Sequence, residues 1–178
     1  MERQAGLDAI AALACVLGWL VWSVVIGGLA RRLPQAVLAD DSWLTRPRPW
    51  PESRKTYERW LGIKRWKPLM PDAGDALPGG VRKNSLVGRD AGTLHRLVEE
   101  TRRAELVHLA IWPFWIVTAL WLPPVGVVIN LSFATLFNLP CLWLQRYNRL
   151  RLLPLLLAMS NRQGENNPGD QPIQQASV

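Results

Sequence analysis

The stretch EETRRAELVHLAIWPFW, residues 99–115, changes from charged to apolar within about one helical turn. This pattern is typical of a helix that passes from a polar surface into a lipid bilayer. At roughly 100° per residue, one stripe of the helix carries Arg102, Glu105, His108 and Trp112. Because an ionisable residue in a membrane segment usually has a function, we expect this stripe to form part of a functional site.

The composition supports a membrane protein of one modest domain. The chain has 178 residues, of which 49% are hydrophobic and ten are tryptophan, and its formal net charge is +7. A basic chain can bind nucleic acid or an anionic membrane face. The apolar spans favour the membrane, and no groove-reading motif accompanies the charge, so no nucleic acid partner is expected.

The first apolar run, Ala9–Ala30, has no charged residue. As a helix it would rise about 33 Å, enough to cross a hydrocarbon core of about 30 Å. The alternative is a cleaved signal peptide with a cleavage site at Gly28-x-Ala30. The weakly basic start and the length of the run favour a retained transmembrane helix over residues 1–32.

A helical hairpin is expected at residues 106–145. Its arms are Leu106–Leu122 and Val125–Leu144, joined at Pro123-Pro124. Asn130 and Asn138 within it fit interhelical hydrogen-bond partners better than catalytic groups. The remaining predictions are a basic cytoplasmic or interfacial region at residues 33–105, an interfacial segment at 146–160 and a disordered tail at 161–178.

The predicted fold class is therefore an all-α integral membrane protein with about three transmembrane helices. Basic residues flank the first two spans on their shared side, at positions Arg31, Arg32, Arg46, Arg48, Arg89, Arg96, Arg102 and Arg103. The positive-inside rule then places the middle region in the cytoplasm and Met1 outside. We expect a multi-pass protein of the bacterial cell (inner) membrane.

Few motifs carry recognisable chemistry. There is no Walker loop, dinucleotide fingerprint or nucleophile elbow. His95 and Glu100 would point apart on a continuous helix. Glu105-x-x-His108 places both side chains on one face, which leaves open an interfacial histidine paired with Arg102 or a general acid–base pair. A di-iron site needs a second Glu-x-x-His, so no metal is expected.

Five blocks together resemble the glycosyl-4,4'-diaponeurosporenoate acyltransferases, small membrane enzymes of staphyloxanthin-type carotenoid biosynthesis. They are Lys64-Arg-Trp-Lys67, Pro71-Asp72-Ala-Gly74, Glu100-Thr-Arg-Arg-Ala-Glu-Leu-Val-His108, Asn138-Leu-Pro140 and Gln145-Arg-Tyr-Asn-Arg149. The resemblance covers roughly residues 57–157. It implies transfer of a fatty acyl group to a sugar hydroxyl of a glycosylated C30 carotenoid. The longer middle loop with Pro78-Gly79-Gly80 and the polar tail depart from the pattern.

On this hypothesis His108, oriented by Glu105, deprotonates the acceptor hydroxyl. The expected substrate-binding residues are Arg102, Lys64, Arg65, Trp66, Lys67, Asp72, Arg146, Tyr147, Asn148 and Arg149, with Arg102 or Asn148 stabilising the oxyanion and the other cations binding the donor's phosphates. The expected partners are membrane lipid, a lipophilic glycosylated acceptor and acyl-CoA or another acyl thioester as co-substrate, with no bound cofactor. The alternative is a non-enzymatic membrane protein that binds lipid or scaffolds a lipid-pathway complex.

Overall fold

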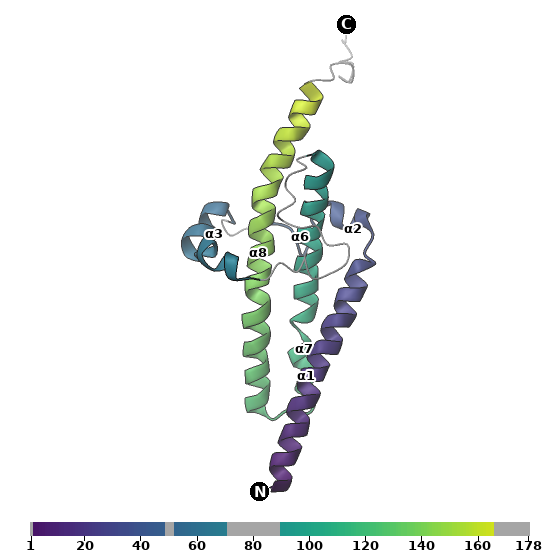
Figure 1. The fold of residues 1–178 in the computed structure, drawn as a ribbon, viewed down its shortest axis with the longest axis vertical. Helices are drawn as coiled ribbons and strands as arrows, with labels where there is room; N and C mark the ends of the chain where they lie inside the picture. The colour runs from purple at the N-terminus through teal and green to yellow at the C-terminus, as the bar shows by residue number, and fades with distance from the viewer. Residues whose placement is uncertain (1, 49–51, 71–89, 166–178) are drawn as a thin grey trace.

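The computed structural model describes residues 2–48, 52–70 and 90–165, and every regular element in these ranges is helical. Three long helices dominate: α1 (Glu2–Arg31), α6 (Ala91–Ile111) and α8 (Pro124–Glu165). Figure 1 shows α8 running beside α6 and the short α7 (Phe114–Thr118), while α1 crosses their lower end. The expected all-α fold is confirmed for the described residues.

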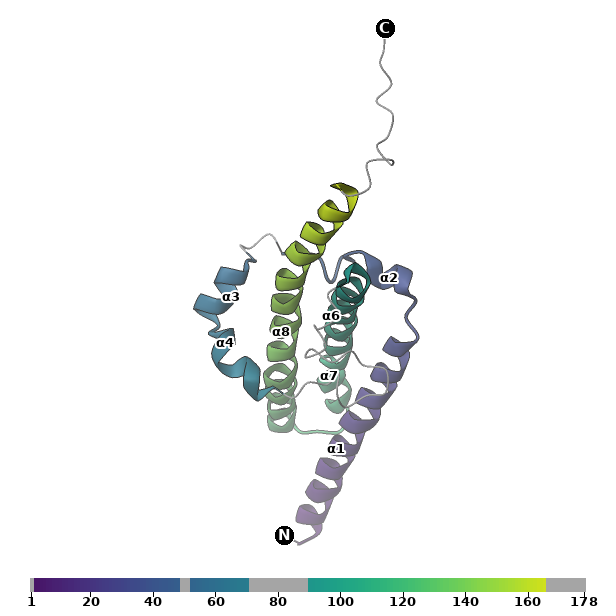
Figure 2. The ribbon, with the colours of Figure 1, turned by 45° about the horizontal axis from the view of Figure 1, so that its top comes forward.

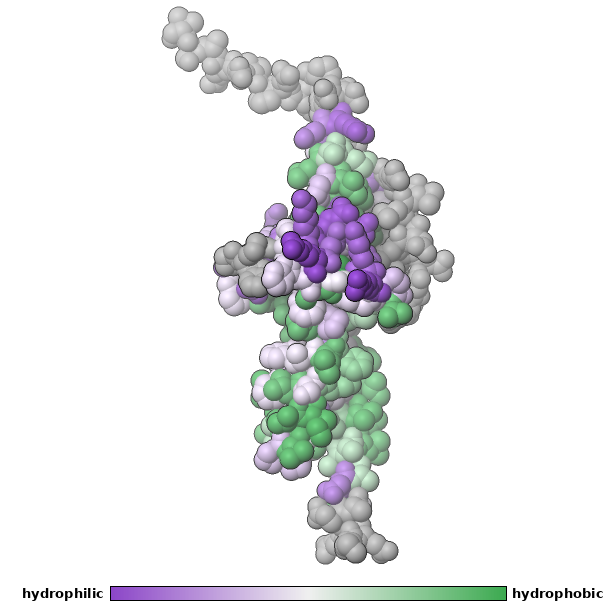
Figure 3. Space-filling view, turned by 90° about the vertical axis from the view of Figure 1, so that its left-hand side faces the viewer, coloured by the Kyte–Doolittle hydropathy of each residue, from purple (hydrophilic) through white to green (hydrophobic). Residues whose placement is uncertain are grey.

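Two helices are long and apolar enough to cross a membrane, α1 over Gly6–Arg31 and α8 over Pro124–Arg162. Large apolar side chains on both are exposed, among them Leu13, Val24, Val128 and Leu136. Figure 3 shows the hydrophobic surface of the lower half of the molecule, beneath a hydrophilic middle. Apolar side chains that face outward along such helices indicate contact with lipid rather than water, so the protein is membrane-associated.

The segment between these helices is not one continuous helix. Within residues 106–122, expected as the second span, α6 ends at Ile111 and α7 begins only at Phe114. Pro113 lies at the break. It interrupts the helix because proline cannot donate a backbone hydrogen bond and its ring disfavours a continuous helix.

The amphipathic pattern of α6 follows from its sequence. The carboxylate of Asp90 accepts the Thr93 amide at 2.7 Å and caps the first turn. Buried side chains then recur at helical spacing, at Leu94, Leu97, Val98, Glu99, Thr101, Arg102 and Glu105. The buried stripe becomes polar toward Glu105, so α6 must find charged partners there.

α6 and α8 meet along a ladder of polar contacts. Glu105 binds Arg146 and Arg149, the His108 ring bonds Asn138, and the Trp112 indole N–H donates to Thr135 at 3.2 Å. Three residues of the predicted stripe, Glu105, His108 and Trp112, therefore contact α8.

α1 packs on the apolar half of this pair. Asn130 of α8 accepts the Trp19 indole N–H at 2.8 Å and the Cys15 thiol at 3.0 Å. The Trp19 ring packs edge-on against Phe114, with centroids 5.0 Å apart. A Cβ on Gly18 would lie 2.9 Å from the Phe114 ring, so glycine permits this close approach. The prediction that Asn130 and Asn138 are interhelical partners is confirmed.

α8 is longer than expected, because it continues through residues 146–160 and ends at Glu165. The segment predicted as interfacial is therefore helical and continuous with α8, which also includes residues 161–165 of the predicted tail; residues 166–178 lie outside the described ranges. Pro140 and Pro154 do not end the helix. No glycine interrupts the sequence between Gly126 and Gly164, and the leucines and arginines there are strong helix formers.

Four short helices complete the described region: α2 (Gln35–Ala39), α3 (Arg54–Trp60), α4 (Ile63–Trp66) and the 3-10 helix η1 (Lys67–Leu69). Residues 54–69 form what we call the arm, which lies beside α8 in Figures 1 and 2. Gly62, with φ 56°, makes the left-handed turn between α3 and α4. Tyr57 and Ile63 pack against Leu144 and Tyr147 and hold the arm on α8.

Replacing Asn130 tests the docking of α1. In Asn130→Leu the Trp19 indole loses its acceptor, and we expect a destabilisation of about 0.6–1.7 kcal/mol, the size of an interhelical hydrogen bond in a membrane protein. Thermal unfolding in detergent measures it. Ser132→Ala is the matched control, since Ser132 bonds only the Val128 carbonyl of its own helix; equal melting temperatures for the two variants would contradict this packing.

Candidate active site

The centre of the site is the buried carboxylate of Glu105 on α6, which is fully shielded from solvent. One oxygen accepts the Arg146 Nε–H at 2.6 Å, and the other accepts an Arg149 N–H at 2.8 Å. Arg146 and Arg149 lie three residues apart on α8 and so reach the same point. One carboxylate on α6 therefore joins two guanidinium groups of α8.

The same arginines hold the chain that precedes the arm. Arg146 donates to both oxygens of Glu52 at 3.1 Å and to the Leu44 carbonyl at 3.1 Å. Arg149 donates to the Thr45 carbonyl at 2.6 Å. Because these partners lie about a hundred residues away in sequence, α8 fixes the position of the irregular segment, whose own hydrogen bonds in the described ranges join only near neighbours such as Ser42 and Thr45.

A third arginine, Arg102, connects α6 with α2 and with Asp41. Arg102 binds Asp41 at 2.8 Å and donates to the carbonyls of Leu38 and Ala39 at 2.9 and 2.7 Å. These carbonyls belong to the last residues of α2, and a basic side chain near a helix C-terminus is a common way to satisfy them. Arg102 therefore anchors α2 to α6.

We refer to these six residues as the ion-pair network: Asp41, Glu52, Glu105, Arg102, Arg146 and Arg149. It holds three carboxylates and three guanidinium groups, so its formal charge is zero. Burying a single unpaired charge costs several kcal/mol, whereas a balanced and hydrogen-bonded set avoids most of that cost. The network can therefore lie at the base of the hydrophilic layer without excess charge.

Glu52 has a perturbed acidity within the network. Burial alone would raise the pKa of Glu52, but hydrogen bonds from the Tyr57 hydroxyl and the Arg48 amide, together with the charge of Arg146, lower it below 4.5. Burial and the hydrogen bond to Glu52 raise the pKa of Tyr57. Glu52 thus stays ionised and Tyr57 stays a neutral donor at physiological pH.

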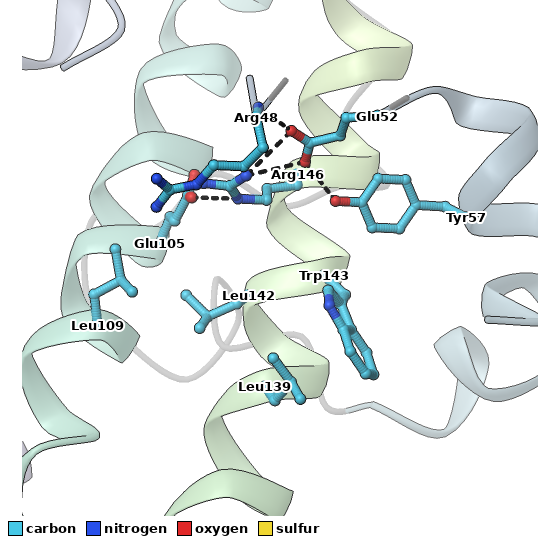
Figure 4. A pocket seen from close by; sticks show the side chains of 9 residues that line it. All are labelled: Arg48, Glu52, Tyr57, Glu105, Leu109, Leu139, Leu142, Trp143 and Arg146. Atoms are coloured by element: carbon cyan, nitrogen blue, oxygen red, sulfur yellow. Dashed lines mark hydrogen bonds and ion pairs between the residues drawn. The ribbon is translucent and has the colours of Figure 1, made fainter. Parts of the chain in front are cut away.

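A cavity of about 340 Å³ lies beside the network. Figure 4 shows its two ends: the polar side chains of Arg48, Glu52, Tyr57, Glu105 and Arg146 gather above, and the apolar side chains of Leu109, Leu139, Leu142 and Trp143 lie below. We call it the amphipathic pocket. The distribution of polar and apolar residues along its wall suits a molecule with a polar group at one end and a hydrocarbon body at the other.

Arg48 is the pocket cation whose charge is not neutralised. Its backbone N–H bonds Glu52, but its exposed guanidinium forms no ion pair with any residue in the described ranges. Sequence reasoning did not select Arg48, Glu52 or Tyr57 for the site. The segment around them has neither helical nor strand periodicity, so no pattern indicated which side chains would meet α8.

His108 lies next to the pocket rather than in its wall. Its Nδ1 is 3.0 Å from Asn138 Oδ1, and the Asn138 amide nitrogen donates to the Ala134 carbonyl at 2.8 Å. The carbonyl fixes which end of the amide is the nitrogen, so Oδ1 must accept from His108. The proton of a neutral ring is then on Nδ1, which leaves Nε2 as a base. Leu109 and Leu139, the sequence neighbours of this pair, line the pocket.

This geometry corrects several sequence-based expectations. Glu105 does not orient His108, because both of its oxygens bind arginines and Asn138 holds the ring instead. Arg146 and Arg149 are engaged by carboxylates rather than open for phosphates. Arg102 is likewise occupied at α2 and does not face the pocket.

The other predicted site residues lie where the arm meets α8. Lys67 donates to Asn148 Oδ1 at 2.8 Å, Tyr147 donates to Glu58 at 2.9 Å, and the Trp66 indole bonds the Leu61 carbonyl. Lys64 pairs with Glu58, and Arg65 is exposed. Bonds from Lys64 and Arg54 lower the pKa of Glu58 to about 2. Asp72 lies outside the described residues. Within the described ranges, no three His, Cys, Asp or Glu side chains form a metal-binding group.

Removing the charge of Glu105 tests the network. Glu105→Gln leaves Arg146 and Arg149 without their shared counter-charge, so we expect a loss of about 3–5 kcal/mol in unfolding free energy. Glu100→Gln, on the same helix, breaks the more exposed pair with Arg103 and should cost less than about 1 kcal/mol. Equal unfolding midpoints in denaturant for the two variants would show that the buried network is not what stabilises the fold.

Comparison with known proteins adds the family. The family model for glycosyl-4,4'-diaponeurosporenoate acyltransferase matches residues 40–158, which include the whole ion-pair network and the described pocket. Proteins of that name from Staphylococcus aureus strains MRSA252 and USA300 are 27% identical over 149 residues, covering 83% of this chain and 89% of theirs. For strain Newman the figures are 27% over 154 residues, 86% and 92%. No solved structure matches. The chain belongs to the glycosyl-4,4'-diaponeurosporenoate acyltransferase family.

Proposed function

We propose that this chain is a membrane acyltransferase that moves a fatty acyl group from an activated thioester, such as acyl-CoA, to a sugar hydroxyl of a glycosylated carotenoid. The name of the relatives supports both the reaction and the acceptor. The observation that carries the proposal is the amphipathic pocket within the matched residues. Its apolar wall suits the acyl chain and the acceptor's hydrocarbon body, and its charged end suits the sugar and the thioester.

The proposed setting is the cytoplasmic face of a bacterial cell membrane. Three segments would cross the apolar layer: α1, the lower part of α6 with α7, and the first half of α8. Their side-by-side course in Figure 1 supports this arrangement. The excess of basic residues around the hydrophilic layer supports a cytoplasmic position for that layer and an N-terminus on the outside.

The proposed base is His108, positioned by Asn138. The hydroxyl of the acceptor would meet Nε2 at the seam of α6 and α8 beside Leu109. As Nε2 takes the proton, the alkoxide oxygen attacks the thioester carbonyl. The resulting tetrahedral intermediate collapses, the C–S bond breaks as the ester C–O bond is kept, and the imidazolium returns its proton to the departing thiolate. The reaction consumes one thioester and one hydroxyl and yields one ester and one thiol.

Arg48 is the proposed ligand for the donor's anionic part. It lies at the polar end of the pocket, its guanidinium group forms no ion pair with a described residue, and a planar guanidinium group binds two phosphate oxygens at once. This replaces Arg146 and Arg149, whose donors are committed to the network. The donor would approach from the cytoplasm while its acyl chain enters along Leu139 and Leu142.

Replacing His108 tests the base. His108→Ala should lower the rate of acyl ester formation by about 10²- to 10⁴-fold, the contribution of a positioned general base. The measurement is mass spectrometry of the glycosylated lipid in membranes that contain equal amounts of each protein.

His95→Ala is the matched control for this variant. It removes the other histidine of the chain from the same helix, where that residue is exposed and bonds Glu99, so its turnover should stay near the wild-type value. Wild-type turnover in His108→Ala would contradict the assignment of the base. Ester formation that is absent even with the wild-type protein would favour a lipid-binding or scaffolding protein instead.

Replacing Arg48 tests the donor site. Loss of a charge-assisted contact of about 1.5–3 kcal/mol should raise the KM for the thioester at least about tenfold in Arg48→Ala, with a smaller effect on kcat. Arg46→Ala removes an exposed cation two residues away that does not line the pocket and should leave the KM unchanged. A KM that rises equally in both variants would point to general electrostatic attraction and not to a site at Arg48.

A further inference from the structure

The arm has an inner face that packs on α8 and an outer face of exposed side chains. Inside, Tyr57 and Ile63 are buried against Leu144 and Tyr147 of α8. Outside, Arg54, Lys55, Arg59, Lys64 and Arg65 are exposed. The exposed cations of the outer face therefore do not take part in packing the arm on α8.

This outer surface is strongly basic. It carries the five exposed basic side chains and one acidic side chain, Glu58, a net charge of +4, while the sixth cation of the arm, Lys67, faces Asn148 of α8. Glu58 is already paired with Arg54 and Lys64 at 2.8 Å. The remaining positive charge repels itself unless an anionic surface lies nearby.

Large apolar side chains stand among these cations. Trp60 is 81% exposed and Leu69 is 82% exposed. Trp66, six residues after Trp60, is by contrast packed on the core of the arm with its indole N–H bonded. Fully exposed tryptophan and leucine beside lysine and arginine are typical of segments that bind a membrane surface, where the apolar groups enter the interface and the cations meet phosphates.

The position of the arm agrees with such a contact. In Figure 3, which looks at the side where the arm lies, the hydrophilic surface stands directly above the hydrophobic lower half. In Figures 1 and 2 the arm extends sideways from α8, and it packs on Leu144 and Tyr147, next to Arg146 of the ion-pair network. A segment at that level lies next to the headgroups of the bilayer that surrounds the helices below.

We propose that the arm binds the anionic headgroups of the membrane in which its own helices are embedded, with Trp60 and Leu69 inserted at the interface. The proposal rests on membrane association and does not depend on acyl transfer. It has a consequence for the pocket, because Tyr57 belongs both to the arm and to the pocket wall. Lipid contact on the outer face of the arm therefore restricts the motion of Tyr57, which forms part of the pocket wall on the inner face of the arm.

Hydrogen–deuterium exchange of the full chain in nanodiscs tests the proposal. One set of discs contains phosphatidylcholine alone, and the other contains about one third phosphatidylglycerol, an anionic lipid. We expect the arm amides to exchange more slowly in the anionic discs, by about fivefold for each cation that contacts the surface. Equal exchange in the two discs would overturn the proposal.

Charge-reversed variants identify the surface. The double variant Lys55→Glu with Arg59→Glu should lose the protection, and Trp60→Ser should reduce it. Arg96→Glu, which reverses an exposed charge on α6 outside the arm, should keep it. Protection that survives in the double variant would overturn the proposal. So would protection produced by soluble acyl-CoA in neutral discs but not by phosphatidylglycerol, which would make the arm a donor site.

Discussion

The carboxylate of Glu105 between Arg146 and Arg149 is the interaction on which the rest of the structure depends. It lies fully buried where α6 and α8 leave the apolar layer. Through the two arginines it also fixes Leu44, Thr45 and Glu52, and Asp41 links this set to Arg102 and α2. A charge pair broken in such surroundings costs far more than an exposed one, so the partners must remain together.

The ion pairs of Glu105 separate the residues that hold the structure together from those proposed to act on substrate. The arginines of α8 already bind Glu105, whereas the Arg48 guanidinium group forms no ion pair with any described residue, and this is why Arg48 is the proposed ligand for the donor. One turn below Glu105, His108 is free of the carboxylate and held by an amide. A neutral amide partner sets the tautomer of the ring without stabilising its charged form as a carboxylate would. The network thus forms the polar end of the pocket, and the proposed binding and catalytic roles belong to Arg48 and His108 beside it.

The sequence predicted whatever depends on local periodicity. The stripe of Arg102, Glu105, His108 and Trp112, the Pro123-Pro124 reversal and the interhelical roles of Asn130 and Asn138 all follow from helical spacing and apolar runs. Helical spacing does not predict which residues of α8 bind this stripe. Glu105 and His108 are neighbours on one helix, yet each is captured by a different residue of α8, because tertiary contacts outweigh a local pairing.

The irregular segment was least accessible to prediction. Glu52 and Arg146 are 94 residues apart, and no periodic signal connects them. The polar residues from Gln145 onward predict the end of a membrane span but not the end of the helix, because helix propensity does not require an apolar environment. At about 63 Å, the helix is roughly twice as long as the hydrocarbon core is thick.

The central claim is that the acyl chain lies between α6 and α8, on the apolar wall of the amphipathic pocket. Photo-crosslinking with a thioester donor that carries a diazirine on its acyl chain tests it most directly, with the adducts located by mass spectrometry of the full-length protein in membranes. The account predicts adducts on Leu139, Leu142 and Trp143 that excess unlabelled donor removes. Adducts confined to the lipid-facing side chains of the same helix, such as Leu136 and Phe137, and insensitive to that competition would contradict it.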